Sequence, residues 1–264
     1  MDNSNDTINK LLFLVRAESR IHTLERLSLT EPATRRELCD ALPASRSTIV
    51  RAIDSLVEVG WVSESADGVR LTPVGQVVIE EFLDLVDAVG AAEELTSFLE
   101  WFPLSEFEIG IDELRDGTVT ETADGDPYAP VRQHTALLQT TSQFQALLPS
   151  IGINGIKQIH TRTVAGELDP EFVVPTTVES TIRSEQFAPL FDEMLATGRL
   201  TIHLTDSVPF FLGLGDDGVT QIGVEDDNGI PRALLETSNE TVRSWGAELF
   251  TDYRSSAADQ LTEL

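Results

Sequence analysis

Apolar residues recur at helical spacing through the first third of the chain. Between residues 7 and 29 they fall three or four positions apart, so we predict one helix there, or two in succession. The positions that form this pattern are Ile8, Leu11, Leu12, Val15, Leu24 and Leu27. The polar residues between them would face solvent.

Two capping signals divide the next segment into a helix, a tight turn and a second helix. Thr34 and Glu37 stand three residues apart, as in a capping box, and start a short helix that reaches Leu42. A proline and an alanine form the turn, and Ser45 can cap a helix that ends at Gly60. The buried stripe of this helix would consist of Ile49, Ile53, Leu56 and Val57.

Residues 61–72 have the pattern of a two-stranded hairpin. Two short β-forming runs, 61–64 and 69–72, flank a Ser-Ala-Asp-Gly turn. Pro73 then begins a long amphipathic helix in which Gly90 predicts an interruption, and a further helical stretch continues to residue 103. We therefore predict a winged helix-turn-helix domain over 1–72, followed by linker or dimerisation helices over 73–103.

From residue 104 the pattern alternates between strands and helices. We predict strands at 118–120, 172–174, 200–204, 210–214 and 221–224, and helices over 137–148, 187–196 and 240–253. This alternation indicates a separate α/β regulatory domain over 104–264. The predicted fold class of the whole chain is α+β to α/β.

The charge of the chain is strongly acidic and unevenly distributed. There are 45 Asp and Glu against 18 Lys and Arg, and the formal net charge is −27. Only Lys10 and Lys157 are lysine, which favours a halophilic archaeal protein, soluble in molar salt, over an ordinary acidic protein. Residues 1–80 carry nine basic and twelve acidic residues, a net charge of −3, and the rest carries −24. Only the first third could therefore lie against a polyanion.

Several classes of protein are disfavoured by what the sequence lacks. No apolar run approaches the roughly 20 residues of a membrane span, and the N-terminus lacks a signal-peptide pattern, so we expect a cytoplasmic protein. Cys39 is the single cysteine, which excludes an internal disulfide and a thiolate zinc site. The four histidines show no metal-ligand spacing and nucleotide-binding motifs are absent, so we expect no metal and no cofactor.

A helix-turn-helix reads DNA when its second helix presents polar side chains to the major groove. Opposite the apolar stripe, we expect this helix to present Ser45, Arg46, Ser47, Thr48 and Arg51. Arg35 and Arg36 would meet the flanking phosphate backbone, and Arg70 could reach a phosphate from the wing. The alternative is a winged helix that binds another protein of the transcription machinery.

These segments resemble known archaeal regulators. The winged helix resembles that of haloarchaeal transcription regulators at Thr34-Arg35-Arg36-Glu37-Leu38, Ser45-Arg46-Ser47-Thr48-Ile49, Arg51-Ala52-Ile53 and Gly60-Trp61. The C-terminal end resembles the methanogenesis-regulator middle domain at Trp245-Gly246-Ala247-Glu248-Leu249-Phe250 and Tyr253-Arg254. The resemblance implies a regulator that binds double-stranded promoter DNA as a homodimer and whose C-terminal domain senses a small-molecule effector. We expect it to bind a palindromic or near-palindromic site.

The C-terminal domain offers two further hypotheses about ligands. His160, Arg162 and Glu167 resemble a degenerate phospholipase-D-type motif, but Arg and Glu replace Lys and Asp and no second copy is present. A phosphodiesterase is thus the weakest alternative, and no catalytic residue is assigned. A fold of this kind without catalysis would place an effector site near His160 and Arg162, and an anionic effector could also use Arg183 and Arg199. More commonly, such arginines pair with neighbouring carboxylates.

Overall fold

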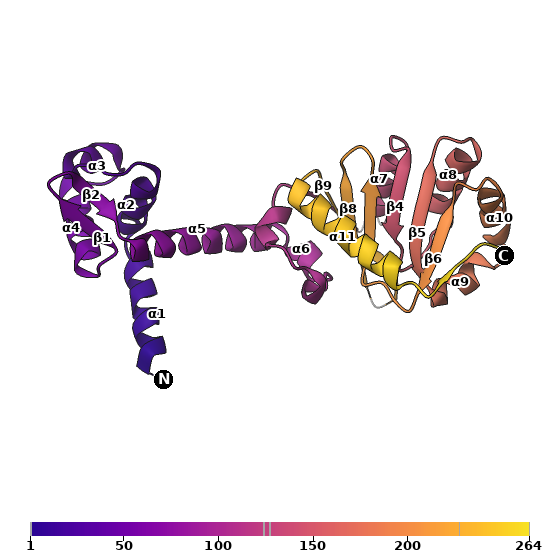
Figure 1. Ribbon diagram of the computed structural model, residues 1–264, viewed down its shortest axis with the longest axis horizontal. Coiled ribbons are helices and arrows are strands. Elements are labelled where there is room, and N and C mark those ends of the chain that lie inside the picture. The colour runs from indigo at the N-terminus through magenta and orange to yellow at the C-terminus, as the bar shows by residue number, and fades with distance from the viewer. Residues whose placement is uncertain (1, 124, 127, 227, 264) are drawn as a thin grey trace. The chain divides into compact units, whose positions relative to one another are not determined.

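The computed structural model describes residues 2–123, 125–126, 128–226 and 228–263, with side chains from residue 5 onward. The chain forms two compact units, Met1–Asp87 and Ala88–Leu264, which we call the N-terminal and C-terminal domains (Figure 1). The division falls within helix α5 (Pro73–Glu94). The finer division into three segments, at residues 72 and 103, stays a prediction.

The N-terminal domain is a group of helices closed by a two-stranded hairpin. Its elements are α1 (Asp2–Val15), α2 (Glu18–Leu29), α3 (Arg35–Ala41), α4 (Arg46–Glu58), β1 (Val62–Ser65), β2 (Gly68–Leu71) and the first part of α5. Their apolar sides meet in one core that includes Leu24, Leu27, Leu38, Ile53 and Leu56. This order of helix, tight turn, helix and hairpin is that of a winged helix-turn-helix, as predicted.

Local capping fixes where α3 and α4 begin and where α4 ends. The Thr34 hydroxyl accepts a hydrogen bond from Glu37 N at 3.2 Å, and Glu37 Oε2 accepts one from Thr34 N at 2.7 Å, which confirms the capping box. The Ser45 hydroxyl accepts a hydrogen bond from Thr48 N at 3.2 Å at the start of α4. The helix stops just before Gly60, whose φ of 77° lies in the left-handed region that favours glycine.

The hairpin packs closely against α5. β1 and β2 pair antiparallel, from Val62 opposite Leu71 to Ser65 opposite Gly68. A Cβ at Gly75, in the first turn of α5, would lie 1.9 Å from the Trp61 carbonyl oxygen. Only glycine therefore permits this approach of the two backbones.

Helix α5 corrects one expectation, because it runs through Gly90 without a break and ends at Glu94. A glycine inside a helix costs about 1 kcal/mol relative to alanine, which is too little to end a helix that is otherwise well formed. A Cβ at Gly90 would lie 3.3 Å from Arg115 Nη2, so the glycine also makes room for this guanidinium. Arg115 in turn lies 3.6 Å from Glu94 Oε1.

The C-terminal domain is built on a mixed sheet of eight strands. Its strands are β3 (Thr118–Glu121), β4 (Gln143–Leu147), β5 (Asp169–Pro175), β6 (Thr201–Thr205), β7 (Phe211–Gly215), β8 (Thr220–Glu225), β9 (Pro231–Thr237) and β10 (Asp259–Gln260). Their order in the sheet is β10-β6-β5-β4-β7-β8-β9-β3. β4, β5 and β6 pair in parallel, and every other pairing is antiparallel.

Helices cover both faces of this sheet (Figure 1). They are α6 (Thr96–Leu99), η1 (Leu104–Glu106), η2 (Ile111–Leu114), α7 (Ala129–Leu137), α8 (Ile153–Val164), α9 (Thr176–Ile182), α10 (Ala188–Ala196) and α11 (Glu240–Ser256). Phe172 and Val174 of β5 point into the core under α7 to α10. Val173, between them, points into the core under α6 and α11. The sheet is therefore the middle layer of three, which confirms the predicted mixed α and β fold.

The prediction of one helix over 137–148 is wrong, since α7 ends at Leu137 and residues 143–147 form strand β4. β4 lies between β5 and β7, where Phe144 and Ala146 face one core and Leu147 the other. The apolar residues of this segment, Leu137, Leu138, Phe144, Leu147 and Leu148, also fit helical spacing, and the short alternation within Gln143–Leu147 is too brief to decide between helix and strand.

Candidate nucleic-acid interface

Helix α4 has one buried and one exposed side. Ile49, Ile53 and Leu56 are fully buried in the N-terminal core. Arg46 and Arg51 lie on the exposed side, and 69% of the Arg46 side chain is accessible. This is the arrangement by which a second helix of a helix-turn-helix can reach base edges and phosphates.

Arg51 keeps its hydrogen-bond donors free. Among the described residues, it makes no ion pair and donates no hydrogen bond. A guanidinium carries five N–H donors in a planar fork, which fits a guanine edge or a phosphate. Arg51 is therefore the side chain on α4 that is best prepared to bind an external group.

Three of the predicted DNA-binding arginines, Arg36, Arg46 and Arg70, make only weak ion pairs. Arg36 Nε and Arg46 Nη2 share Asp40, at 3.7 Å and 3.3 Å from its carboxylate oxygens. Arg70 Nη2 lies 4.0 Å from Asp67 Oδ2 in the wing. Exposed pairs of this kind contribute about 0–1 kcal/mol to stability, so exchange of the carboxylate for a phosphate costs little.

Arg35, at the start of α3, makes strong contacts within the N-terminal domain. Its Nε and Nη2 each donate a 2.7 Å hydrogen bond to the Glu64 carboxylate, and Nη2 also lies 2.7 Å from Asp54 Oδ1. The hydrogen bonds to Glu64 raise the pKa of Arg35 and lower the pKa of Glu64. Through Nε and Nη2, Arg35 therefore holds α3 against α4 and the wing, and its contact with flanking phosphates stays a prediction.

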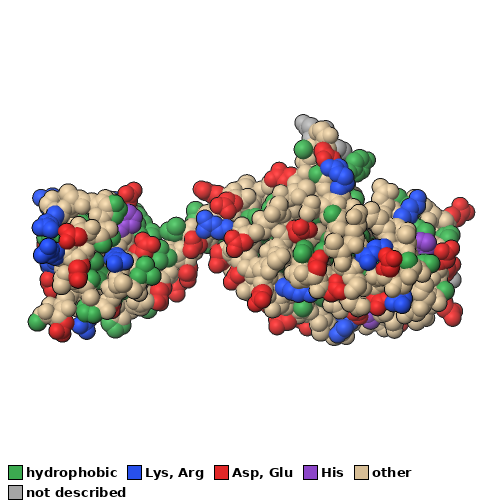
Figure 2. Space-filling view, turned by 90° about the horizontal axis from the view of Figure 1, so that it is seen from above, with side chains coloured by type: hydrophobic (Ala, Val, Ile, Leu, Met, Phe, Trp, Pro, Cys, Tyr) green, Lys and Arg blue, Asp and Glu red, His purple; other side chains and the backbone are tan. Residues whose placement is uncertain are grey.

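The hydroxyl groups of Ser45, Ser47 and Thr48 form hydrogen bonds that cap the start of α4. Ser45 Oγ lies 2.8 Å from Thr48 Oγ1 and 3.0 Å from Ser47 Oγ, besides accepting from the Thr48 amide. Hydroxyls can donate and accept at once, so this cluster retains capacity toward solvent. Figure 2 shows Lys and Arg side chains gathered at the left end of the N-terminal domain, with Asp and Glu side chains beside them.

The four residues predicted for an effector site are each engaged within the C-terminal domain. The structure pairs His160 with Glu193 at 2.8 Å, Arg183 with Glu179 at 2.9 Å, Arg199 with Asp169 at 2.6 Å, and Arg162 with Glu167 at 3.5 Å. None of the four lines the cavity that lies beside α7 and the start of α8. The structure does not gather them around one ligand site, and their role in effector binding stays a prediction.

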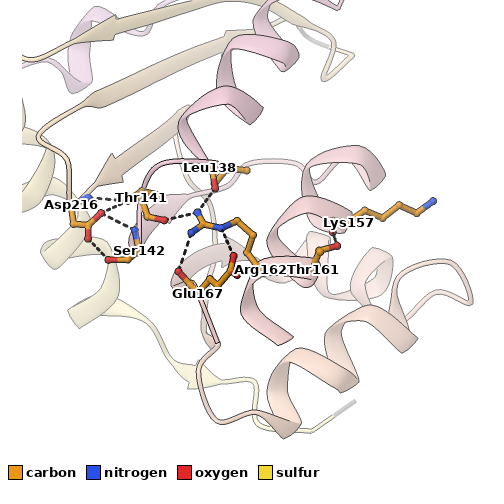
Figure 3. A network of polar contacts seen from close by, with 8 residues as sticks. All are labelled: Leu138, Thr141, Ser142, Lys157, Thr161, Arg162, Glu167 and Asp216. Atoms are coloured by element: carbon orange, nitrogen blue, oxygen red, sulfur yellow. Dashed lines mark hydrogen bonds and ion pairs between the residues drawn. The ribbon is translucent and has the colours of Figure 1, made fainter. Parts of the chain in front are cut away.

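Arg162 shows most clearly what these side chains do (Figure 3). Its Nη1 donates hydrogen bonds of 2.6 Å to the carbonyl oxygens of Leu138 and Thr141, and its Nη2 donates one of 3.1 Å to the Glu167 carbonyl. The guanidinium thus binds the turn between α7 and β4 to the end of α8. Lys157, on the same helix, points its ammonium away from this network.

Two protein families match the chain, one for each domain. Residues 8–94 match the HVO_A0261 N-terminal domain, and residues 127–256 match the middle domain of the methanogenesis regulatory protein FilR1. Each domain of the chain is therefore similar to one of these two domain families. This pair of domains places it among regulatory proteins, as the sequence resemblance implied. No curated protein matches the chain.

Solved structures resemble the chain only distantly. TrmBL2, an archaeal chromatin protein, is 14% identical with a TM-score of 0.44, over 90% of this chain and 92% of its own. Nuc, a phospholipase D family member from Salmonella typhimurium, is 11% identical with a TM-score of 0.42, over 54% and 96%. NucT from Helicobacter pylori is 9% identical with a TM-score of 0.41, over 53% and 96%. The family assignment rests on the domain matches alone.

Sequence reasoning missed the carboxylates that shape the interface. Asp40, Asp54 and Glu64 determine which arginines are free, and each is an ordinary acidic residue in the sequence.

Within the described part of the chain, no cluster of His, Cys, Asp or Glu could hold a metal ion. No helix found there is long and apolar enough to cross a membrane.

Proposed function

We propose that the chain is a sequence-specific, DNA-binding transcription regulator in which α4 enters the major groove. The observation that supports this most is the exposed side of α4, where Arg46 and Arg51 stand opposite a fully buried apolar stripe. The long, exposed ion pairs of Arg36 and Arg46 can be exchanged for phosphates at small cost. The match to an archaeal regulator domain supports the same function.

The acidic composition sets the conditions in which this regulator would act. With a formal net charge of −27, we propose that it works in the cytoplasm of a salt-loving archaeon. Counterion release contributes little to DNA affinity in concentrated salt. Hydrogen bonds to base edges and apolar burial must then supply most of the affinity, which favours a small set of free arginines over a broad basic surface.

We also propose that the regulator is a homodimer held by apolar helix surfaces of the N-terminal domain. The described part of α1 exposes Ile8, Leu11, Leu12 and Val15 by 52%, 47%, 39% and 47%. These residues form one stripe at the spacing of a helix-packing seam. A second copy carries the same stripe, so the two could pack about a twofold axis and present two α4 helices to a palindromic site.

Fluorescence anisotropy with the DNA upstream of the chain's own gene tests DNA binding. In about 1 M KCl we expect saturable binding that competitor DNA does not displace, because base contacts persist when phosphate contacts are screened. Arg51→Ala should weaken binding at least about tenfold, the lower part of the range for loss of a bidentate base contact. Arg183→Ala removes the same charge from the C-terminal domain and should leave binding unchanged.

Two results would argue against the proposal. Equal weakening by Arg51→Ala and Arg183→Ala would mean that only net charge matters. If the folded protein binds neither its upstream DNA nor any other genomic fragment specifically, the alternative of a winged helix that binds another protein would be favoured. Light scattering tests the dimer separately: Leu11→Glu should yield monomers, whereas an unchanged mass would exclude the α1 seam.

A further inference from the structure

A cavity of about 450 Å³ opens in the C-terminal domain between α7, the start of α8 and the strands β7 to β9. Apolar side chains form most of its wall, among them Val131, Ile156, Phe211, Val224 and Leu234. This volume lies within the range of sites that bind small organic molecules. The cavity is lined by no residue of the winged helix and by none of the four residues predicted for an effector site.

Glu225 and His134 bring two hydrogen-bond acceptors to this mostly apolar cavity. Glu225 is half-buried, and its Oε2 accepts a 3.0 Å hydrogen bond from Ser150 Oγ. Its Oε1 makes no hydrogen bond or ion pair among the described residues. Burial raises the pKa of the Glu225 carboxyl, and the charge of the neighbouring Asp226 carboxylate adds to this rise, while the hydrogen bond from Ser150 opposes it.

His134 supplies the second acceptor. Its Nδ1 lies 3.0 Å from Gln221 Oε1, and the Gln221 amide is oriented by its own donation to Glu236 Oε2 at 2.7 Å. Nδ1 therefore carries the proton, and burial lowers the pKa of His134 so that the ring is neutral. Nε2 is left as an acceptor without a partner in the described structure.

The lining residues also determine which ligands are disfavoured. None of the residues that line the cavity is Lys or Arg. An anion would meet the Glu225 carboxylate without a compensating charge, which is costly in an apolar site. A cation would complete an ion pair there, and the Phe211 and His134 rings, 4.7 Å apart, offer aromatic surface to its apolar part.

We propose that this cavity is the effector site and that it takes a small hydrophobic amine, whose ammonium binds Glu225 while its apolar body lies against Phe211 and the aliphatic wall. The inference that the bound ligand acts as an effector rests on the proposed function. Binding of the ligand itself can be tested without DNA. It replaces the anionic effector expected from the arginines with a ligand of opposite charge.

Calorimetric titration of the full chain with phenylbutylamine tests the proposal, with phenylbutyrate as the acidic counterpart of similar size. We expect saturable binding of the amine and at least tenfold weaker binding of the acid. Glu225→Gln should weaken the amine about tenfold, as expected for loss of a charge-assisted contact. Glu185→Gln, at an exposed carboxylate outside the cavity, should have no effect.

A second variant locates the binding without changing a charge. Gly155 lines the cavity in the first turn of α8, and a Cβ there would meet no atom within 4 Å. Gly155→Leu should therefore keep the fold, fill the cavity and abolish amine binding. Failure of the amine to bind, equal affinity for the acid, or unchanged binding by either cavity variant would each overturn the proposal.

The two proposals fail in distinguishable ways. If the protein binds the amine but no specific DNA, the proposed ligand site stands and the proposed function as a DNA-binding regulator fails. If the protein binds promoter DNA but not the amine, the proposed function stands and the proposed ligand site fails. If both hold, saturating amine should change promoter affinity in the wild type and leave it unchanged in Gly155→Leu.

Discussion

The hydrogen bonds of Arg35 provide a sharp test of how α3 and α4 are held against the wing. Arg35→Ala removes two hydrogen bonds to Glu64 and the contact with Asp54, all at 2.7 Å. Hydrogen bonds to charged groups contribute about 1.5–3 kcal/mol when well shielded. Arg35 and Glu64 keep 32% and 40% of their side chains exposed, so solvent screening reduces the expected loss to about 1–2 kcal/mol in total.

Hydrogen exchange read by mass spectrometry can localise this loss in the intact protein. In about 1 M KCl, a loss of 1–2 kcal/mol should speed exchange of the α3, α4 and β1 amides about 5- to 30-fold in Arg35→Ala. Exchange in the C-terminal domain should not change. Arg36→Ala is the matched control, because Arg36 is 85% exposed and lies 3.7 Å from its partner. Equal effects of the two substitutions, or no effect of either, would refute the reasoning.

Three further predictions concern stability and salt. Asp216 accepts hydrogen bonds from Ser142 Oγ, Thr141 Oγ1 and Ser142 N, which hold its pKa far below the ordinary value. The ionised Asp216 therefore stabilises the folded protein fully above the pKa of the unfolded state, near 4, and this contribution is lost as the pH falls further. Asp216→Asn should lower thermal stability at pH 7 by about 1 kcal/mol and flatten its decline in acid, whereas Asp192→Asn should do neither; an unchanged acid profile would count against this. Gly75→Ala should unfold the N-terminal domain, seen as loss of helical circular dichroism, since its Cβ would lie 1.9 Å from Trp61 O, while Gly155→Ala should be neutral or slightly stabilising. The logarithmic salt slope of DNA binding should correspond to about two or three phosphates, and a slope near ten would contradict the account.

The winged helix was predictable because its signals are local. The capping box at Thr34 and the cap at Ser45 each involve residues three apart, and the stripe at Ile49, Ile53 and Leu56 repeats within one helix. Such interactions form whatever the rest of the chain does. The sequence therefore predicted the fold of this domain and most of the buried stripe of α4, although Val57, predicted as part of that stripe, is 38% exposed.

The parts that escaped prediction depend on residues far apart in the chain. Arg35 is held by Glu64, 29 positions away, so no local sequence pattern indicates this contact. β4 is a strand because β5 and β7 pair with it, which overrides a pattern that also suits a helix. The cavity joins His134, Ser150 and Glu225 from three separate segments. Only tertiary structure brings such groups together.

The most direct test of the central claim is whether base preference depends on α4. Affinity would be measured in about 1 M KCl for the best upstream site and for the same site with each base pair changed in turn, using wild type and Arg51→Ala. We expect one or more positions where a base-pair change costs the wild type about 1–3 kcal/mol of binding free energy and costs Arg51→Ala almost nothing. Uniform binding of all sites by the wild type, or the same base preferences in both proteins, would contradict it.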